Sequence, residues 1–252
     1  MSTAVAETIR ERRLDLAAAL RWAARERLNE GVDNHFSVAV PDDDGVVRGD
    51  RFLINPYGLH WCEMTASDLV LCHADGEVLE PGKVVEDTAF CIHAPIHRQA
   101  PHAVAVLHTH QPYATALTVL DEGRLEMCEQ NALQFDERIA YDDEYEGLAL
   151  DPAEGARLAH KLGNRSVLML ASHGVVVTGP SVGEAFTDLY YLERAAMFQV
   201  HARSTGGRLR TISEPVRARV REQMAGDRPK LAERHFAAVR RILDREEPAY
   251  RL

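Results

Sequence analysis

The chain has few cysteines, and none of them stands in a paired motif. Four are scattered along 252 residues without a Cys-x-x-Cys spacing, which excludes a zinc knuckle and argues against a disulfide framework. They are Cys62, Cys72, Cys91 and Cys128. The first thirty residues lack the unbroken apolar core of a signal peptide, and no apolar run approaches the roughly twenty residues that cross a membrane. We therefore expect a cytoplasmic protein with free thiols.

Positive charges are fewer than negative charges. Lys and Arg number 29 against 39 Asp and Glu, and this net charge of −10 disfavours nucleic acid and anionic membranes as partners. The balance reverses strongly in residues 203–252, which carry 13 Lys and Arg against 7 Asp and Glu. We expect one domain over residues 1–210 and a basic helical extension over 211–252. The extension is either a solvated helix or a segment that docks on the acidic body of its own or a neighbouring subunit.

Apolar periodicity predicts helices that cover a central sheet. Helical spacing is found over residues 6–29 and 88–99, after Pro112, from the capping box at Ser181 to Gly206, and in a last amphipathic segment before Pro248. Short strand patterns occur at 36–40, 52–55, 69–72, 104–110 and on both sides of the turn at 172–174. This order indicates an α/β or α+β domain.

The most informative motif is a His-x-His pair at the end of a predicted strand, in Val104-Ala-Val-Leu-His-Thr-His-Gln-Pro112. Side chains two residues apart on a strand share a face, so His108 and His110 can approach one metal ion. His173 also lies at a strand end, in a Ser-His-Gly turn. A histidine is more often a packing residue than a ligand, but three at strand ends indicate a metal site with open positions, as in metalloenzymes.

Several further blocks resemble the class II aldolase/adducin superfamily over about residues 14–204. Asn34-His-Phe-Ser37 is similar to its Gly-Asn-x-Ser region, Asn55-Pro-Tyr-Gly58 to its Ser-Pro-x-Gly turn, and Ile92-His-Ala-Pro-Ile-His97 to its Leu-His-x-x-Ile-Tyr helix. Residues 63–70 and 142–147 resemble the adducin-like branch in particular.

The resemblance implies a three-layer α/β/α domain with a mostly antiparallel central sheet. It implies a cyclic homotetramer with sites between subunits, and a divalent ion held by His108, His110 and His173. Zinc is the ion we expect first, with manganese and Fe(II) as alternatives. The substrate-binding residues that it suggests are Asn34, His35, Tyr57, Gly58, Asp87 and His93.

One departure from the family pattern bears on the reaction. Aldolases of this family carry Pro-Ser-Ser-Glu before the Leu-His helix, where the serines hold phosphate and the Glu is the base. The corresponding residues here are Glu86-Asp87-Thr88-Ala89. Alanine neither ligates a metal nor accepts a proton, so the usual base is missing unless Glu86 or Asp87 replaces it. An acidic residue at the phosphate position favours a non-phosphorylated substrate.

Replacement acid/base groups can be named from their positions. Tyr113 follows the metal strand, although a tyrosine at a helix start is more often a packing residue. Glu129 lies where the family places pocket residues, although a loop carboxylate is usually solvated. His93 has a structural interpretation as a buried, hydrogen-bonded ring, and His35 has one as a turn cap.

Three functions remain open from the sequence. The leading hypothesis is a divalent-metal-dependent lyase, acting by aldol-type cleavage or decarboxylation on a small non-phosphorylated oxygenated acid or keto compound. The same ligands would suit a non-haem Fe(II) oxygenase. The third hypothesis is an adducin-like scaffold without catalysis, in which the basic extension binds a partner.

Overall fold

A computed structural model describes residues 2–252 and contains one seven-stranded sheet with the strand order β3-β2-β1-β4-β7-β6-β5. Its strands are β1 (His35–Ala39), β2 (Arg51–Ile54), β3 (Val70–His73), β4 (Ala105–Thr109), β5 (Ile139–Asp142), β6 (Val167–Leu170) and β7 (Gly174–Gly179). Neighbouring strands are antiparallel except β5 and β6, which are parallel. The expected mostly antiparallel sheet is confirmed.

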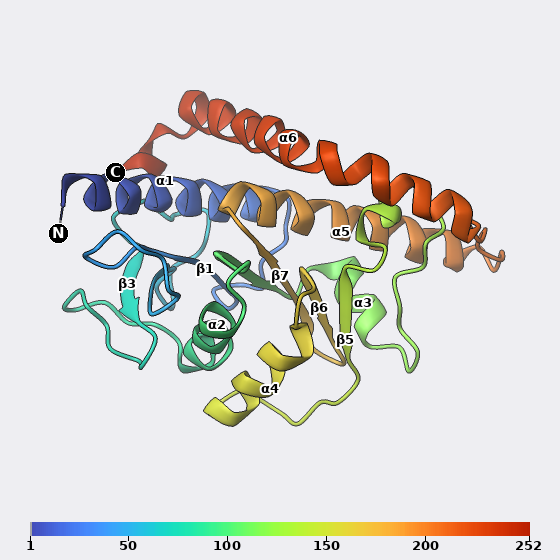
Figure 1. The fold of residues 1–252 in the computed structure, drawn as a ribbon, viewed down its shortest axis with the longest axis horizontal. Coiled ribbons are helices and arrows are strands. Elements are labelled where there is room, and N and C mark those ends of the chain that lie inside the picture. Colours follow the sequence, from blue (N-terminus) through green and yellow to red (C-terminus); the bar gives the residue numbers. More distant parts are fainter. Residues whose placement is uncertain (1) are drawn as a thin grey trace.

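Helices cover both faces of this sheet, which confirms the three-layer arrangement (Figure 1). On one side lie α1 (Thr3–Arg25), α5 (Val182–Ser204) and α6 (Glu214–Glu246), and on the other α2 (Asp87–Gln99) and α4 (Pro152–Leu162). The short α3 (Pro112–Thr118) packs against α5, and two 3-10 turns span Ala132–Phe135 and Pro248–Arg251. Among residues 2–252, no helix combines the length and the apolarity that a membrane crossing requires.

Strand β4 divides its side chains between the two layers. Ala105 and Leu107 belong to the apolar cluster that α1 and α5 cover, whereas Val106 belongs to the cluster under α2 and α4. Because successive strand side chains alternate between faces, His108 shares the α2 face with Val106. In the antiparallel register, His35 of β1 is the direct partner of His108. The sheet thus brings two histidines together on one face.

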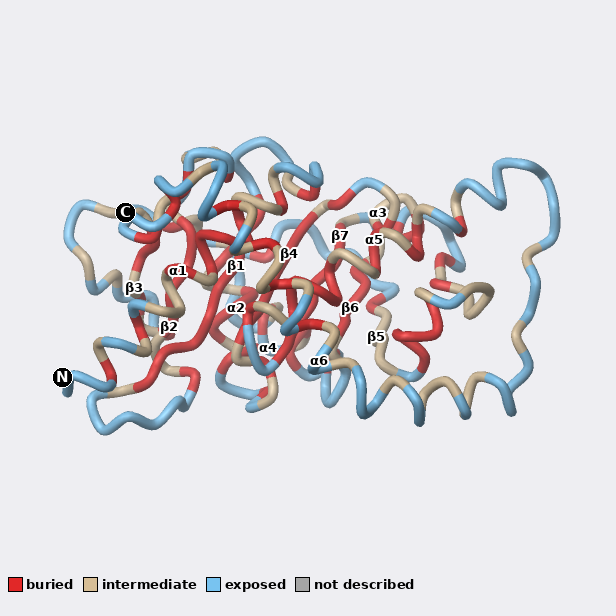
Figure 2. Tube along the Cα trace, turned by 90° about the horizontal axis from the view of Figure 1, so that it is seen from above, coloured by how far each residue is buried: buried red, intermediate tan, exposed pale blue. Residues whose placement is uncertain are grey.

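The basic C-terminal segment packs on its own chain. Phe236, Val239 and Leu243 of α6 are buried in the main core, while the opposite side of the helix is exposed (Figure 2). Arg228 donates to Asp188 at 2.7 Å, and Arg240 donates to Asp15 at 2.7 Å. Of the two interpretations of this segment, docking on the acidic body of the same chain agrees with the structure.

Candidate metal centre

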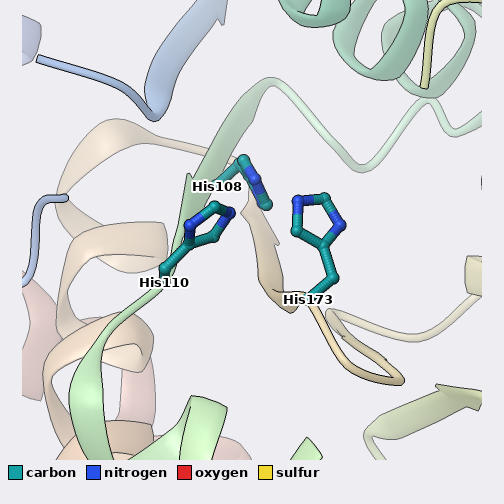
Figure 3. Close-up of side chains that lie close together, drawn as sticks. All are labelled: His108, His110 and His173. Carbon is teal, nitrogen blue, oxygen red and sulfur yellow. The ribbon is translucent and has the colours of Figure 1, made fainter. Parts of the chain in front are cut away.

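His108, His110 and His173 meet at one end of the sheet (Figure 3). His108 lies on β4, His110 directly follows that strand, and His173 lies in the turn between β6 and β7. Their ring centroids are 4.8 to 5.0 Å apart, and one nitrogen of each ring lies within 4.8 Å of the others. The predicted ligands are therefore neighbours in space.

The β6–β7 turn owes its position to two backbone features. Ser172 has a φ of +55°, a left-handed conformation that turns the chain sharply. A Cβ atom on Gly174 would lie 2.5 Å from the carbonyl oxygen of Thr109 and 2.8 Å from Cδ2 of His110. Only glycine lets the turn approach the end of β4 this closely.

Two of the three rings have a hydrogen-bonding environment that leaves a nitrogen available to a metal ion. His108 donates through Nδ1 to the carbonyl oxygen of Val175 at 3.0 Å, which leaves the lone pair of Nε2 free. Nε2 of His110 is buried and has no hydrogen-bond partner among residues 2–252. A buried nitrogen without a partner is costly unless a cation or donor meets it. The donor set therefore fits a divalent ion.

Burial also keeps these rings in the neutral form that binds metals. Loss of solvent, and secondarily the neighbouring histidines, lower the pKa of His108 well below its usual value. The same causes lower the pKa of His173 to about 4. Protons therefore do not compete for these nitrogens near neutral pH.

The side chain of Asn34, which directly precedes β1, links this part of the chain to the backbone of His110. Asn34 has a φ of +72°, which asparagine tolerates better than most residues. Its Oδ1 accepts hydrogen bonds from the backbone amides of Glu30 at 3.0 Å and His110 at 3.2 Å. This buried side chain fixes the chain at the point where His110 leaves β4.

The three histidines border a cavity of about 210 Å³. Asn34 and His35 line it from the start of β1, and Glu86 and Thr88 from the start of α2. Tyr145 and residues 147–149 line it from a loop. The cavity is smaller than the roughly 300 Å³ at which pockets for drug-sized ligands begin. It suits a small molecule.

The structure separates the other predicted substrate-binding residues. Asn34 and His35 line the cavity, and His93 lies fully buried behind His35. Asp87, Tyr57 and Gly58 do not line it; Asp87 is exposed at the start of α2, and Tyr57 is 53% exposed. For these three residues, substrate binding stays a prediction.

The two predicted acid/base residues lie outside this cavity. The Tyr113 hydroxyl is 3.2 Å from Nε2 of His201. The Glu129 carboxylate accepts from the backbone amides of Asn131 and Ala132 and so caps a 3-10 turn. Their catalytic roles stay predictions.

Ala89 and its neighbour Glu86 have opposite environments. Ala89 is 1% exposed and packs in the apolar cluster that contains Phe52 and Ile54. Glu86 precedes the first turn of α2 and lines the cavity, 3.8 Å from Nε2 of His35. From the sequence, Glu86 and Asp87 are equal candidates to replace the missing base. The structure distinguishes them, because Glu86 lines the cavity and Asp87 does not.

Comparison with known proteins places the chain in a family. The sequence model of the family described as the class II aldolase and adducin N-terminal domain matches residues 14–200 of this chain. An adducin-related protein from Schizosaccharomyces pombe is 34% identical over 75% of this chain, and this chain spans 58% of its length. A putative aldolase class 2 protein from Caulobacter vibrioides is 32% identical over 98% of this chain and 94% of its own.

A solved structure agrees over the whole length. The aldolase II superfamily protein from Pseudomonas syringae has a TM-score of 0.88 and 37% identity, covering 100% of this chain and 98% of that protein. The family match, the relatives and the shared fold lead to one conclusion: this chain belongs to the class II aldolase/adducin family.

Proposed function

We propose that this protein is a divalent-metal-dependent lyase that acts on a small non-phosphorylated oxygenated acid or keto compound. The observation that carries the proposal is the meeting of three imidazoles at the edge of a small cavity. A divalent ion held by His108, His110 and His173, with zinc expected first, would stabilise the negative charge that develops on a substrate oxygen when a C–C bond breaks.

The residues of the cavity favour a substrate without phosphate. Asp33 and Glu86 bring two carboxylates to its lining. Like-charge repulsion would oppose a dianionic phosphate there. Of the two carboxylates at the start of α2, only Glu86 lines the cavity, so we assign it the acid/base role in proton transfer to or from the substrate.

We also propose that the cavity borders a subunit interface in a homotetramer. Tyr145 and Leu148 line the cavity, yet they are 54% and 73% exposed, and Leu150 beside them is 59% exposed. Large apolar side chains grouped in this way favour a contact with another protein surface. Light scattering of the purified protein tests the tetramer, and a monomer at micromolar concentration would contradict it.

A direct test of the lyase needs no knowledge of the natural substrate. The zinc-loaded protein is incubated without oxygen in D₂O with pyruvate or dihydroxyacetone, and exchange of the hydrogens next to the carbonyl is followed by NMR. We expect exchange that is lost in His173→Ala and retained in His160→Ala, a control on the exposed face of α4. Less than a tenth of an equivalent of metal after growth in supplemented medium would refute the proposal.

The same preparation distinguishes the second candidate, a scaffold without catalysis. Ala89 and the similarity to an adducin-related protein favour this candidate. It predicts no exchange with any metal and no cellular effect of His108→Ala. Oxygen uptake by the Fe(II)-loaded protein, without anaerobic exchange, would instead indicate the oxygenase.

A further inference from the structure

A continuous chain of hydrogen bonds runs from the cavity through four buried side chains to a backbone carbonyl. Nδ1 of His35 is 2.8 Å from Nε2 of His93, and Nδ1 of His93 is 2.5 Å from the Ser37 hydroxyl. That hydroxyl is 2.7 Å from Nε2 of His97, whose Nδ1 is 2.9 Å from the carbonyl oxygen of Ala103. The four side chains belong to residues no more than 4% exposed.

The spacing of the two elements explains why the chain forms. His35 and Ser37 are two apart on β1 and share a face, while His93 and His97 are four apart on α2 and share a face. Two strand residues rise about 6.6 Å and four helix residues about 6 Å. The two pairs therefore interleave along their length.

The direction of every hydrogen bond follows from the last acceptor. A carbonyl oxygen only accepts, so His97 carries its proton on Nδ1, and its Nε2 accepts from the Ser37 hydroxyl. The single hydroxyl proton is then used, so Ser37 must accept from Nδ1 of His93. Nε2 of His93 in turn accepts from Nδ1 of His35. With neutral rings, this is the only arrangement that satisfies all four contacts.

Burial makes the rings neutral. Loss of solvent lowers the pKa of His97 to about 4 and the pKa of His93 well below its usual value. His35 is 4% exposed, and its Nε2 is 3.8 Å from the Glu86 carboxylate, too far for the hydrogen bond that a protonated ring would donate. Nε2 of His35 is therefore a lone-pair acceptor.

Two acceptors consequently face each other at the cavity wall. Nε2 of His35 and the carboxylate of Glu86 both require a donor, and neither can supply one to the other. The His35 ring is also stacked on the metal-site residue His108, with centroids 5.0 Å apart. A molecule in the cavity with an oxygen at the three histidines would have its adjoining atoms beside this pair of acceptors.

We propose that Nε2 of His35 accepts a hydrogen bond from a hydroxyl group of the substrate, and that Ser37, His93 and His97 are positioning residues that hold His35 in the accepting tautomer. This inference rests on the proposed function, because it assumes a small oxygenated compound in the cavity. It narrows the substrate to hydroxy acids or hydroxy ketones with a free hydroxyl next to the group at the metal site.

The tautomer is measured directly on the unmodified protein. In protein labelled with ¹⁵N-histidine, long-range correlations between ring protons and ring nitrogens distinguish Nδ1–H from Nε2–H, and His35→Phe identifies the signals of His35. We expect Nδ1–H for His35, His93 and His97 without zinc and with it. An Nε2–H tautomer at His35 would overturn the inference and leave the lyase proposal intact.

Binding tests the consequence for selectivity. Glycolate carries a hydroxyl donor, and methoxyacetate replaces its proton by a methyl group. The preference for glycolate is the Kd of methoxyacetate divided by the Kd of glycolate. We expect this ratio to be about tenfold larger in the zinc-loaded wild type than in zinc-loaded Ser37→Ala, because one hydrogen bond of about 1.4 kcal/mol corresponds to a factor of ten. Without Ser37, His35 is free to take the other tautomer and donate.

A matched variant controls for the loss of a buried hydroxyl. Thr187 is buried and contacts Nδ1 of His235 at 3.0 Å, away from the cavity, so Thr187→Ala should retain the preference of the wild type. Equal preferences in the wild type and Ser37→Ala would overturn the inference. Failure of the protein to bind zinc, manganese or Fe(II) would refute the proposed function, and the metal-free NMR spectrum would still report the tautomer.

Discussion

The buried histidine His97 should make the stability of this protein sensitive to mild acid. Burial lowers its pKa to about 4, whereas an unfolded histidine has a pKa near 6.5. Between these values the unfolded chain binds a proton that the folded chain excludes, so stability falls as pH falls from about 6.5 towards 4. From pH 7 to pH 5, His97 alone should cost about 2 kcal/mol of unfolding free energy.

Urea unfolding of the zinc-free protein at the two pH values measures this cost. In His97→Gln the unfolding free energy lost between pH 7 and pH 5 should be about 2 kcal/mol smaller than in the wild type. The other buried histidines are present in both proteins, so their contributions largely cancel in this difference. His160→Gln changes an exposed ring and should retain the wild-type loss. If His97→Gln and the wild type lost the same free energy, the folded protein would not hold His97 neutral, and the reasoning would fail.

Three other perturbations follow from the structure. Zinc at 100 times its Kd should raise the unfolding free energy of the wild type by about 2.7 kcal/mol, and the same zinc concentration should stabilise His173→Ala far less, as read by thermal melting. Asp136→Asn removes the buried carboxylate that accepts from Arg217 and Arg221, and should cost about 2 kcal/mol and speed amide exchange in α6; unchanged exchange would contradict it. Gly174→Ala should weaken zinc binding at least about tenfold, measured by calorimetry, because the added Cβ would collide with the chain beside His110. Gly226→Ala has open space around it in α6 and should instead raise the unfolding free energy by about 0.5 kcal/mol.

Local patterns predicted the parts of the fold that depend on neighbours in sequence. The capping box at Ser181 starts α5, where its hydroxyl accepts from the Glu184 amide at 3.2 Å. The alternation of β4 places Val106 and His108 on one face, and the turn at His173 returns to it. These features needed only a strand period of two and helix start signals.

The sequence patterns did not predict strand β5 or helix α4, and each omission has a physical reason. Strand β5 is four residues long and half-buried at the sheet edge, so it carries no alternating pattern. Helix α4 contains Gly155, which reads as a poor helix residue. A Cβ at that position would lie 1.7 Å from the carbonyl oxygen of Cys91, so the glycine serves the contact between α4 and α2.

The site was predictable at its ligands and less so around them. The three histidines stand at strand ends that the sequence marks. The chain from His35 to His97 depends on how β1 lies under α2, and the distinction between Glu86 and Asp87 depends on the orientation of one helix start. Both arise from tertiary packing, which no local pattern records.

The central claim is that His108, His110 and His173 together bind a divalent ion. The most direct measurement is a crystal structure of the purified protein grown with zinc, with anomalous scattering at the metal edge. The account predicts one ion per chain, with a nitrogen of each of the three histidines about 2.1 Å from it. An anomalous map without a peak among the three rings, at saturating zinc, would contradict it.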